Sequence, residues 1–120
     1  MDSNEPTCEV VITAPDPAWL TDLSRTLVEE RLCAGTHIVT PIRSVYRWEG
    51  EIVEKPEARV ALHTRRSLVP EINHLVGKRH PYLVPCVVAW PIIDGNPEYL
   101  AWIVTETRAP QQLSTYREGL

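Results

Sequence analysis

The chain has 120 residues, 43% apolar and 23% charged, with a net charge of −4. This length favours one globular domain, and an acidic chain lacks the basic surface that nucleic acids require. The sequence has no bilayer-spanning apolar run, no signal-peptide pattern at its start, and three cysteines without C-x-x-C spacing. We therefore expect a reduced, cytoplasmic protein that binds neither nucleic acid nor membrane.

The first two expected elements are a strand and a helix. Residues 8–14 are rich in β-branched side chains, which predicts a strand. Asp16 and Pro17 then combine an N-cap residue with a proline at the first helical position, and leucines at helical spacing predict a helix that ends near residue 33. Gly35 is the expected C-cap, because glycine adopts the left-handed conformation without penalty.

Two long strands joined by a tight turn follow. Residues 36–48 and 51–64 each predict a strand, and the Glu49-Gly50 pair closes the turn because glycine accepts a positive φ. Pro41 cannot donate to a sheet ladder, so it marks a bulge, a bend or an exposed edge. Each strand is about twice the typical length of ~5–6 residues, which predicts a projecting hairpin.

A second helix, a fourth strand and a short third helix complete the expected fold. The second helix begins near Ser67 and ends at Gly77. Residues 86–93 form a continuous apolar run, as in a strand covered on both faces. An Asn-Pro pair starts the last helix, over 98–107, and the segment 108–120 is expected to be a flexible tail.

This order of elements predicts an α+β domain of the ferredoxin-like βαββαβ type over residues 1–107, with a short C-terminal helix added. Two helices would cover one face of a four-stranded antiparallel sheet and leave the other face bare. The distal hairpin carries Val45, Tyr46, Trp48 and Ile52, and an exposed apolar edge invites uncontrolled pairing. A closed ring of identical subunits would cover this edge. The alternative is a hairpin that curls over its own sheet.

Two residues are candidate metal ligands. His80 follows the second helix, and a neutral imidazole is a good ligand for copper or zinc. The alternative for this ring is a hydrogen bond to a loop carbonyl. Cys86 would add a soft thiolate six positions later, although H-x5-C is not a recognised ligand spacing.

Four further residues are candidates for a surface or cleft on the hairpin. His37 and His63 lie on the two long strands and face one surface if the register brings them there. Tyr46 and Trp48 either line a ligand cleft or pack against a neighbouring subunit. The sequence has no Gly-rich phosphate loop, H-E-x-x-H or G-x-S-x-G motif, so we expect no enzyme.

A further signal comes from short runs in a fixed order: Thr13-Ala14-Pro15-Asp16, Arg43 to Gly50, His80-Pro81-Tyr82 with Val84-Pro85, Pro91-Ile92 with Gly95, and Tyr99 to Ile103. Read together, these runs resemble the CutA family of divalent-ion tolerance proteins over about residues 8–104. The resemblance implies a ferredoxin-like subunit, related in architecture to PII signalling proteins, that assembles as a homotrimer. It also implies a non-enzymatic role in divalent metal tolerance, with weak copper binding and no required cofactor. The alternative is a signalling or adaptor scaffold that binds a small effector between subunits.

The chain departs from the usual family pattern at several polar positions. We therefore expect copper binding to be weaker than in typical members, to depend mainly on His80, and to involve Cys86 as the one nearby soft ligand. The departures are Gly35-Thr36-His37 for a Cys-Val-Asn run, His63 for a Lys, Cys86 and Leu83 for two Glu, and Ile12 for a Cys found in some members.

Overall fold

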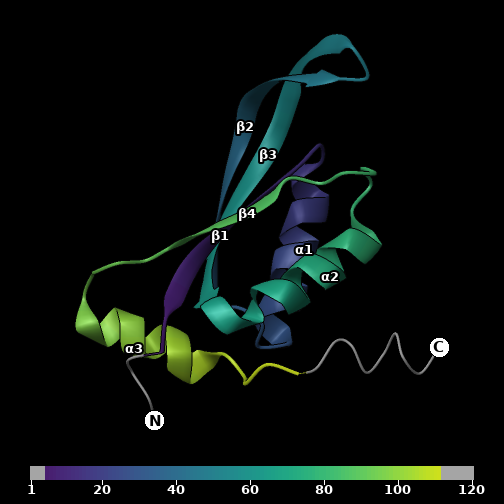
Figure 1. Ribbon diagram of the computed structural model, residues 1–120. Coiled ribbons are helices and arrows are strands. Elements are labelled where there is room, and N and C mark those ends of the chain that lie inside the picture. Colours follow the sequence, from purple (N-terminus) through teal and green to yellow (C-terminus); the bar gives the residue numbers. More distant parts are fainter. Residues whose placement is uncertain (1–4, 112–120) are drawn as a thin grey trace, which may run out of the picture.

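A four-stranded antiparallel sheet forms the centre of the fold (Figure 1). Figure 1 is a computed structural model in which residues 5–111 are described. The strand order is β2-β3-β1-β4, and the predicted α+β class is confirmed. The elements are β1 (Thr7–Ala14), α1 (Pro17–Glu29), β2 (Gly35–Trp48), β3 (Glu51–Arg65), the 3₁₀ turn η1 (Arg66–Leu68), α2 (Val69–Arg79), β4 (Val87–Pro91) and α3 (Pro97–Glu106).

Helices α1 and α2 cover one face of the sheet, and the core lies between these helices and the sheet. Strand side chains alternate between faces, so the even-numbered residues of β1 and of the second half of β3 point toward the helices. Each helix contributes an apolar stripe at helical spacing. The central core residues are Val10, Ile12, Val60, Leu62, Leu20, Leu27, Ile72 and Val76, all with 0% exposure.

The opposite face of the sheet, here called the open face, is covered at one end by α3 (Figure 1). Asn96 caps this helix, because its side-chain oxygen accepts from the Glu98 N–H at 3.0 Å. Gly35, at the start of β2, lies beside the ring of Trp102, where a Cβ would make an ordinary van der Waals contact at 3.5 Å. The helix therefore docks where β2 begins and β3 ends.

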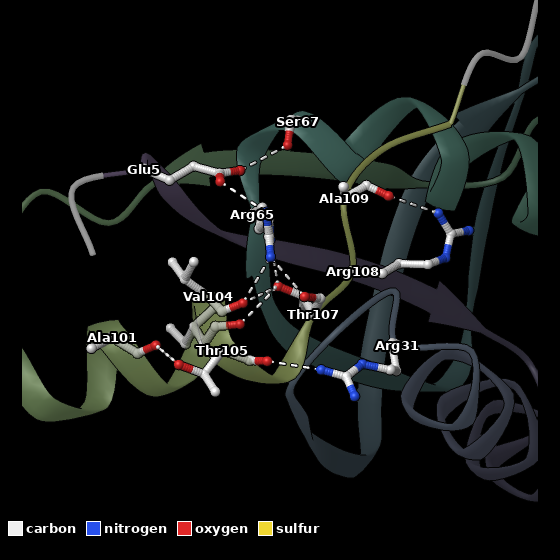
Figure 2. Close-up of polar contacts among 11 residues, drawn as sticks. Glu5, Arg31, Arg65, Ser67, Ala101, Val104, Thr105, Thr107, Arg108 and Ala109 are labelled. Carbon is white, nitrogen blue, oxygen red and sulfur yellow. Dashed lines mark hydrogen bonds and ion pairs between the residues drawn. The ribbon is translucent and has the colours of Figure 1, made fainter. Parts of the chain in front are cut away.

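Arg65 fixes the C-terminal end of α3 (Figure 2). Its Nη2 donates to the carbonyl oxygens of Val104 and Thr107, at 3.0 and 2.8 Å, and its Nε donates to Thr107 Oγ1 at 2.9 Å. Its Nη1 pairs with Glu5 at 3.0 Å. One guanidinium thus satisfies carbonyls that a helix end leaves without partners and ties them to the end of β3.

The end of α1 differs from the prediction. The helix stops at Glu29, and Arg31 adopts the left-handed conformation with φ 59° in place of Gly35. Arg31 Nη2 donates to the Thr105 carbonyl at 2.8 Å (Figure 2). The Arg31 carbonyl also accepts from the Arg108 N–H at 3.0 Å. These contacts offset the cost of a positive φ at a residue with a side chain.

The hairpin of β2 and β3 projects beyond the helices (Figure 1). Its turn residues, Glu49 and Gly50, have φ values of 50° and 82°. Positive φ at both positions is typical of the type I′ turn, whose twist matches that of the strands. The pairing register shifts between Val39 and Ile42, so the predicted irregularity at Pro41 is confirmed as a bulge.

Two predictions near the C-terminal half are wrong. Helix α2 passes through Gly77 and ends at Arg79, because an isolated glycine weakens a helix without ending it. Strand β4 is not covered on both faces, since Val88 and Trp90 are 47% and 42% exposed. In the predicted tail 108–120, Arg108 and the Gln111 N–H both bind Glu71, and residues 112–120 lie outside the described part of the chain.

Candidate functional site

His80 is buried at the end of α2, with 8% exposure. Its Nε2 lies 2.8 Å from the Thr13 carbonyl oxygen, and its Nδ1 lies 3.0 Å from the Tyr82 N. A carbonyl only accepts and a backbone N–H only donates, so this geometry assigns the proton to Nε2. Both ring nitrogens therefore have partners, and a metal ion would have to displace one of them.

Cys86, the other predicted metal ligand, is exposed just before β4. Within residues 5–111, no group of three or more His, Cys, Asp and Glu side chains is placed to hold a metal ion. The other two cysteines are buried, and burial raises the pKa of Cys8 to about 11 and that of Cys33 to about 12. Thiolates are the metal-binding form, so these two thiols are poor ligands near neutral pH.

His63 is the centre of a hydrogen-bond network on the open face. Its Nε2 lies 2.9 Å from Glu9 Oε2, and its Nδ1 lies 2.6 Å from the Tyr99 hydroxyl. The other oxygen of Glu9 accepts from Trp90 Nε1 at 3.1 Å. Burial first, and the negative charge of Glu9 second, raise the pKa of Tyr99. In the neutral tautomer with its proton on Nε2, His63 donates to the Glu9 carboxylate and accepts from the Tyr99 hydroxyl at Nδ1.

The strand register explains why these residues meet. Glu9 lies opposite His63 on β3 and opposite Trp90 on β4, and directly opposed residues point to the same face of a sheet. The His37 ring lies edge-on to His63 with centroids 6.1 Å apart, so these two histidines share one surface. On α3, Tyr99 stacks on the half-exposed ring of Trp102 at 5.5 Å.

A second polar cluster lies at the base of the hairpin. The Glu57 carboxylate is buried and accepts from the Tyr82 hydroxyl at 2.5 Å. Lys55 Nζ lies 3.9 Å from the same carboxylate, 4.4 Å from the Tyr82 ring centroid and 5.9 Å from that of Tyr46. Hydrogen bonding to Tyr82 first, and to Tyr46 next, raises the pKa of Lys55. This cluster fastens the segment after α2 to the hairpin.

Exposed apolar side chains gather on two separate parts of the sheet. The hairpin patch consists of Val45 and Ile52, with 61% and 62% exposure, which share the hairpin face opposite to the open face. Trp48, 40% exposed, points to the open face. The β4 patch consists of Val88 and Trp90. Strands β2 and β4 are the two edges of the sheet, so each edge strand lies beside or within an apolar patch.

Sequence reasoning did not identify several members of the two polar clusters. A carboxylate inside an apolar strand was the available signal for Glu9, and a buried acidic residue rarely lacks a partner. Tyr99 and Tyr82 gave no comparable signal, because they reach His63 and Glu57 from segments far away in the sequence. The other unpredicted members are Lys55, Glu57 and Trp90.

Relatives of known name match most of this chain. Residues 8–106 match the model of the CutA1 divalent ion tolerance protein family. The divalent-cation tolerance protein CutA of Thermus thermophilus is 42% identical over 98 residues, which are 82% of this chain and 95% of that protein. Protein CutA of Mus musculus is 39% identical over 98 residues, 80% of this chain and 55% of the mouse protein. The chain thus spans about half the length of the mouse relative.

Solved structures show the same fold. The crystal structure of CutA1 from Oryza sativa has a TM-score of 0.87 and 35% identity, covering 91% of this chain and 100% of that one. The structure of the divalent cation tolerance protein from Thermus thermophilus has a TM-score of 0.82 and 40% identity, covering 85% and 99%. The match of the family model spans both long strands, the two polar clusters and α3. This chain belongs to the CutA1 divalent ion tolerance protein family.

Proposed function

We propose that this chain is a non-enzymatic protein of divalent metal tolerance that works as a homotrimer of ferredoxin-like subunits. The observation that carries the assembly is the position of the two apolar patches at different parts of the sheet. Contact between the hairpin patch of one subunit and the β4 patch of the next is heterologous, and a heterologous contact gives a ring when the rotation between neighbouring subunits closes. The strand order β2-β3-β1-β4 supports the ferredoxin-like description.

Light scattering coupled to size-exclusion chromatography tests the assembly. A trimer has three times the 13.6 kDa mass of one chain, and we expect that mass at micromolar concentration. A monomer mass under these conditions contradicts the proposal.

The metal component of the proposal places copper at His80 and Cys86. Cys86 is exposed and supplies a soft ligand, whereas His80 must first give up its bond to Thr13 or Tyr82. We therefore expect weak binding that prefers copper(I). Titration of reduced protein with copper(I) and copper(II), compared with His80→Ala and Cys86→Ser, tests the site. Equal affinity of all three proteins contradicts it.

The second candidate is a signalling or adaptor scaffold that binds a small effector between subunits. The cluster of Lys55, Tyr46, Tyr82 and Glu57 favours it, because cationic, phenolic and carboxylate groups meet at the base of the hairpin. A ligand that binds only the folded state raises the melting temperature. A thermal-shift screen with nucleotides and metabolites tests this candidate, and a Tyr46→Phe variant serves to locate any hit.

Catalysis and compartment are the remaining parts of the proposal. The family and its relatives are named as tolerance proteins, which supports a role without catalysis. Relatives include a CutA named chloroplastic and one named periplasmic. No helix within residues 5–111 is long and apolar enough to cross a membrane. All three thiols are free, which supports the cytoplasm as the compartment, and fractionation of cells with a tagged chain tests it.

A further inference from the structure

A cavity of about 360 Å³ lies beside α2, away from both polar clusters of the sheet. One stripe of α2 forms its long wall, since Glu71, His74, Leu75, Lys78 and Arg79 follow the spacing i, i+3, i+4, i+7, i+8. The stripe is mostly polar, whereas the neighbouring stripe of α2 enters the core. The rest of the lining comes from Glu30 and Leu32 after α1, and from Arg108 and Gln111 after α3.

The buried carboxylate in this lining is already neutralised. Glu71 is 7% exposed, and its Oε1 lies 2.7 Å from Arg108 Nη2. Its Oε2 accepts from the Gln111 N–H at 2.7 Å. Arg108 in turn donates to the Glu30 and Ala109 carbonyl oxygens (Figure 2 shows the second). Glu71 and Arg108 are therefore already paired within the protein, and neither offers an unpaired charge to a ligand.

The cations on the rest of the stripe have no such partners. Within residues 5–111, the side chains of His74, Lys78 and Arg79 make no hydrogen bond or ion pair. Apart from Glu71 and Arg108, the lining has two permanent positive charges, on Lys78 and Arg79, and one exposed carboxylate, that of Glu30. Arg79 also lines a smaller hollow between α1 and α2. The cavity thus carries an excess of positive charge in a chain whose net charge is −4.

We propose that this cavity binds a small organic anion, with its phosphate or carboxylate group on Lys78 and Arg79 and its apolar body against Leu32 and Leu75. Cationic side chains bind such groups through charge-assisted hydrogen bonds. The volume falls within the range of about 300–1,000 Å³ that is typical of small-molecule sites. The site lies beside the helices, across the sheet from the open face, so it depends neither on assembly nor on metal.

Isothermal titration with phenyl phosphate and with benzoate tests the site, because both place an anion on the same ring. Saturable binding of either probe is expected, and the tighter of the two identifies the anionic group. Benzyl alcohol, which has the ring without the charge, is expected to show no saturable heat. Lys78→Gln and Arg79→Gln should each raise the Kd by about tenfold or more, as expected for a lost charge-assisted hydrogen bond.

Arg25→Gln is the matched control, because Arg25 is an exposed helical arginine outside the lining. It removes one positive charge and should leave the Kd within about twofold, since an exposed charge that does not line the cavity is screened by salt. The proposal is overturned if neither anion binds saturably, if benzyl alcohol binds equally well, or if Arg25→Gln weakens binding as much as Arg79→Gln. The particle mass and the copper isotherm of each variant report separately on assembly and metal binding.

Discussion

Replacing Arg65 by Met should detach the C-terminal end of α3 from the sheet. Methionine keeps a long apolar stem but has no donor for the carbonyl oxygens of Val104 and Thr107. It also removes the partner of Glu5. The Val104 carbonyl keeps a longer bond from the Thr107 N–H, at 3.4 Å, so the main loss falls on the Thr107 carbonyl.

The size of the effect follows from how deeply these groups lie. Val104 and Thr107 are each 2% exposed, and a buried acceptor without a partner costs ~1–3 kcal/mol. Water entering the space beside Met would recover part of this loss. We therefore expect the free energy of unfolding to fall by about 2 kcal/mol, with the Thr107 carbonyl contributing most of it.

Urea denaturation at fixed protomer concentration measures the change, because assembly makes stability depend on concentration. Arg43→Met is the matched control: Arg43 also pairs with a glutamate, Glu54, at 2.9 Å, but their side chains are 67% and 54% exposed. Exposed pairs contribute ~0–1 kcal/mol. Hydrogen exchange should also become faster in α3 of the Arg65 variant than in β1. Equal losses for the two variants, or unchanged protection of α3, would refute the reasoning.

Three further predictions concern assembly, thiol reactivity and the hairpin base. Trp48→Ala should lower the trimer fraction in light scattering by costing ~2 kcal/mol or more at the interface, and a variant with unchanged mass and Tm would place this ring outside it. At pH 8, a maleimide should label exposed Cys86 quickly and Cys33 slowly, because burial raises the pKa of Cys33 to about 12 and keeps it a thiol; peptide mapping that finds equal labelling rates would contradict this. Tyr82→Phe should lower stability by about 1–2 kcal/mol, since it removes the hydroxyl that donates to the buried carboxylate of Glu57; an unchanged urea midpoint would show that water replaces this bond.

The sequence predicted the start of a helix correctly where a single N-cap side chain determines it. Asp16 and Asn96 each accept a hydrogen bond from the N–H two residues later, as N-cap residues do. The end of α1 was predicted wrongly because Arg31 has partners after α3, and no local pattern reports those contacts. Tertiary contacts therefore decided the end of α1, which the glycine signal misplaced.

The candidate site was less predictable than the fold. His63 was identified as a candidate, but its partners Glu9 and Tyr99 lie 54 and 36 positions away. Those contacts require the register of β1 on β3 and the docking of α3, neither of which is readable from one sequence. The exposure of Val88 and Trp90 has a similar cause, because an apolar run has the same sequence pattern whether its cover comes from its own chain or from another copy.

The bulge in β2 determines which side chains of the hairpin point to which face of the sheet. Before it, odd residues such as His37 share the open face with odd residues of β3, and after it the even residues Tyr46 and Trp48 do so. Removing one residue within the bulge would leave all the remaining β2–β3 residue pairs on their present faces. Inserting or deleting one residue anywhere from 42 to 48 would instead turn the side chains on one side of the change to the opposite face. Natural length variation in this strand should therefore be confined to the bulge.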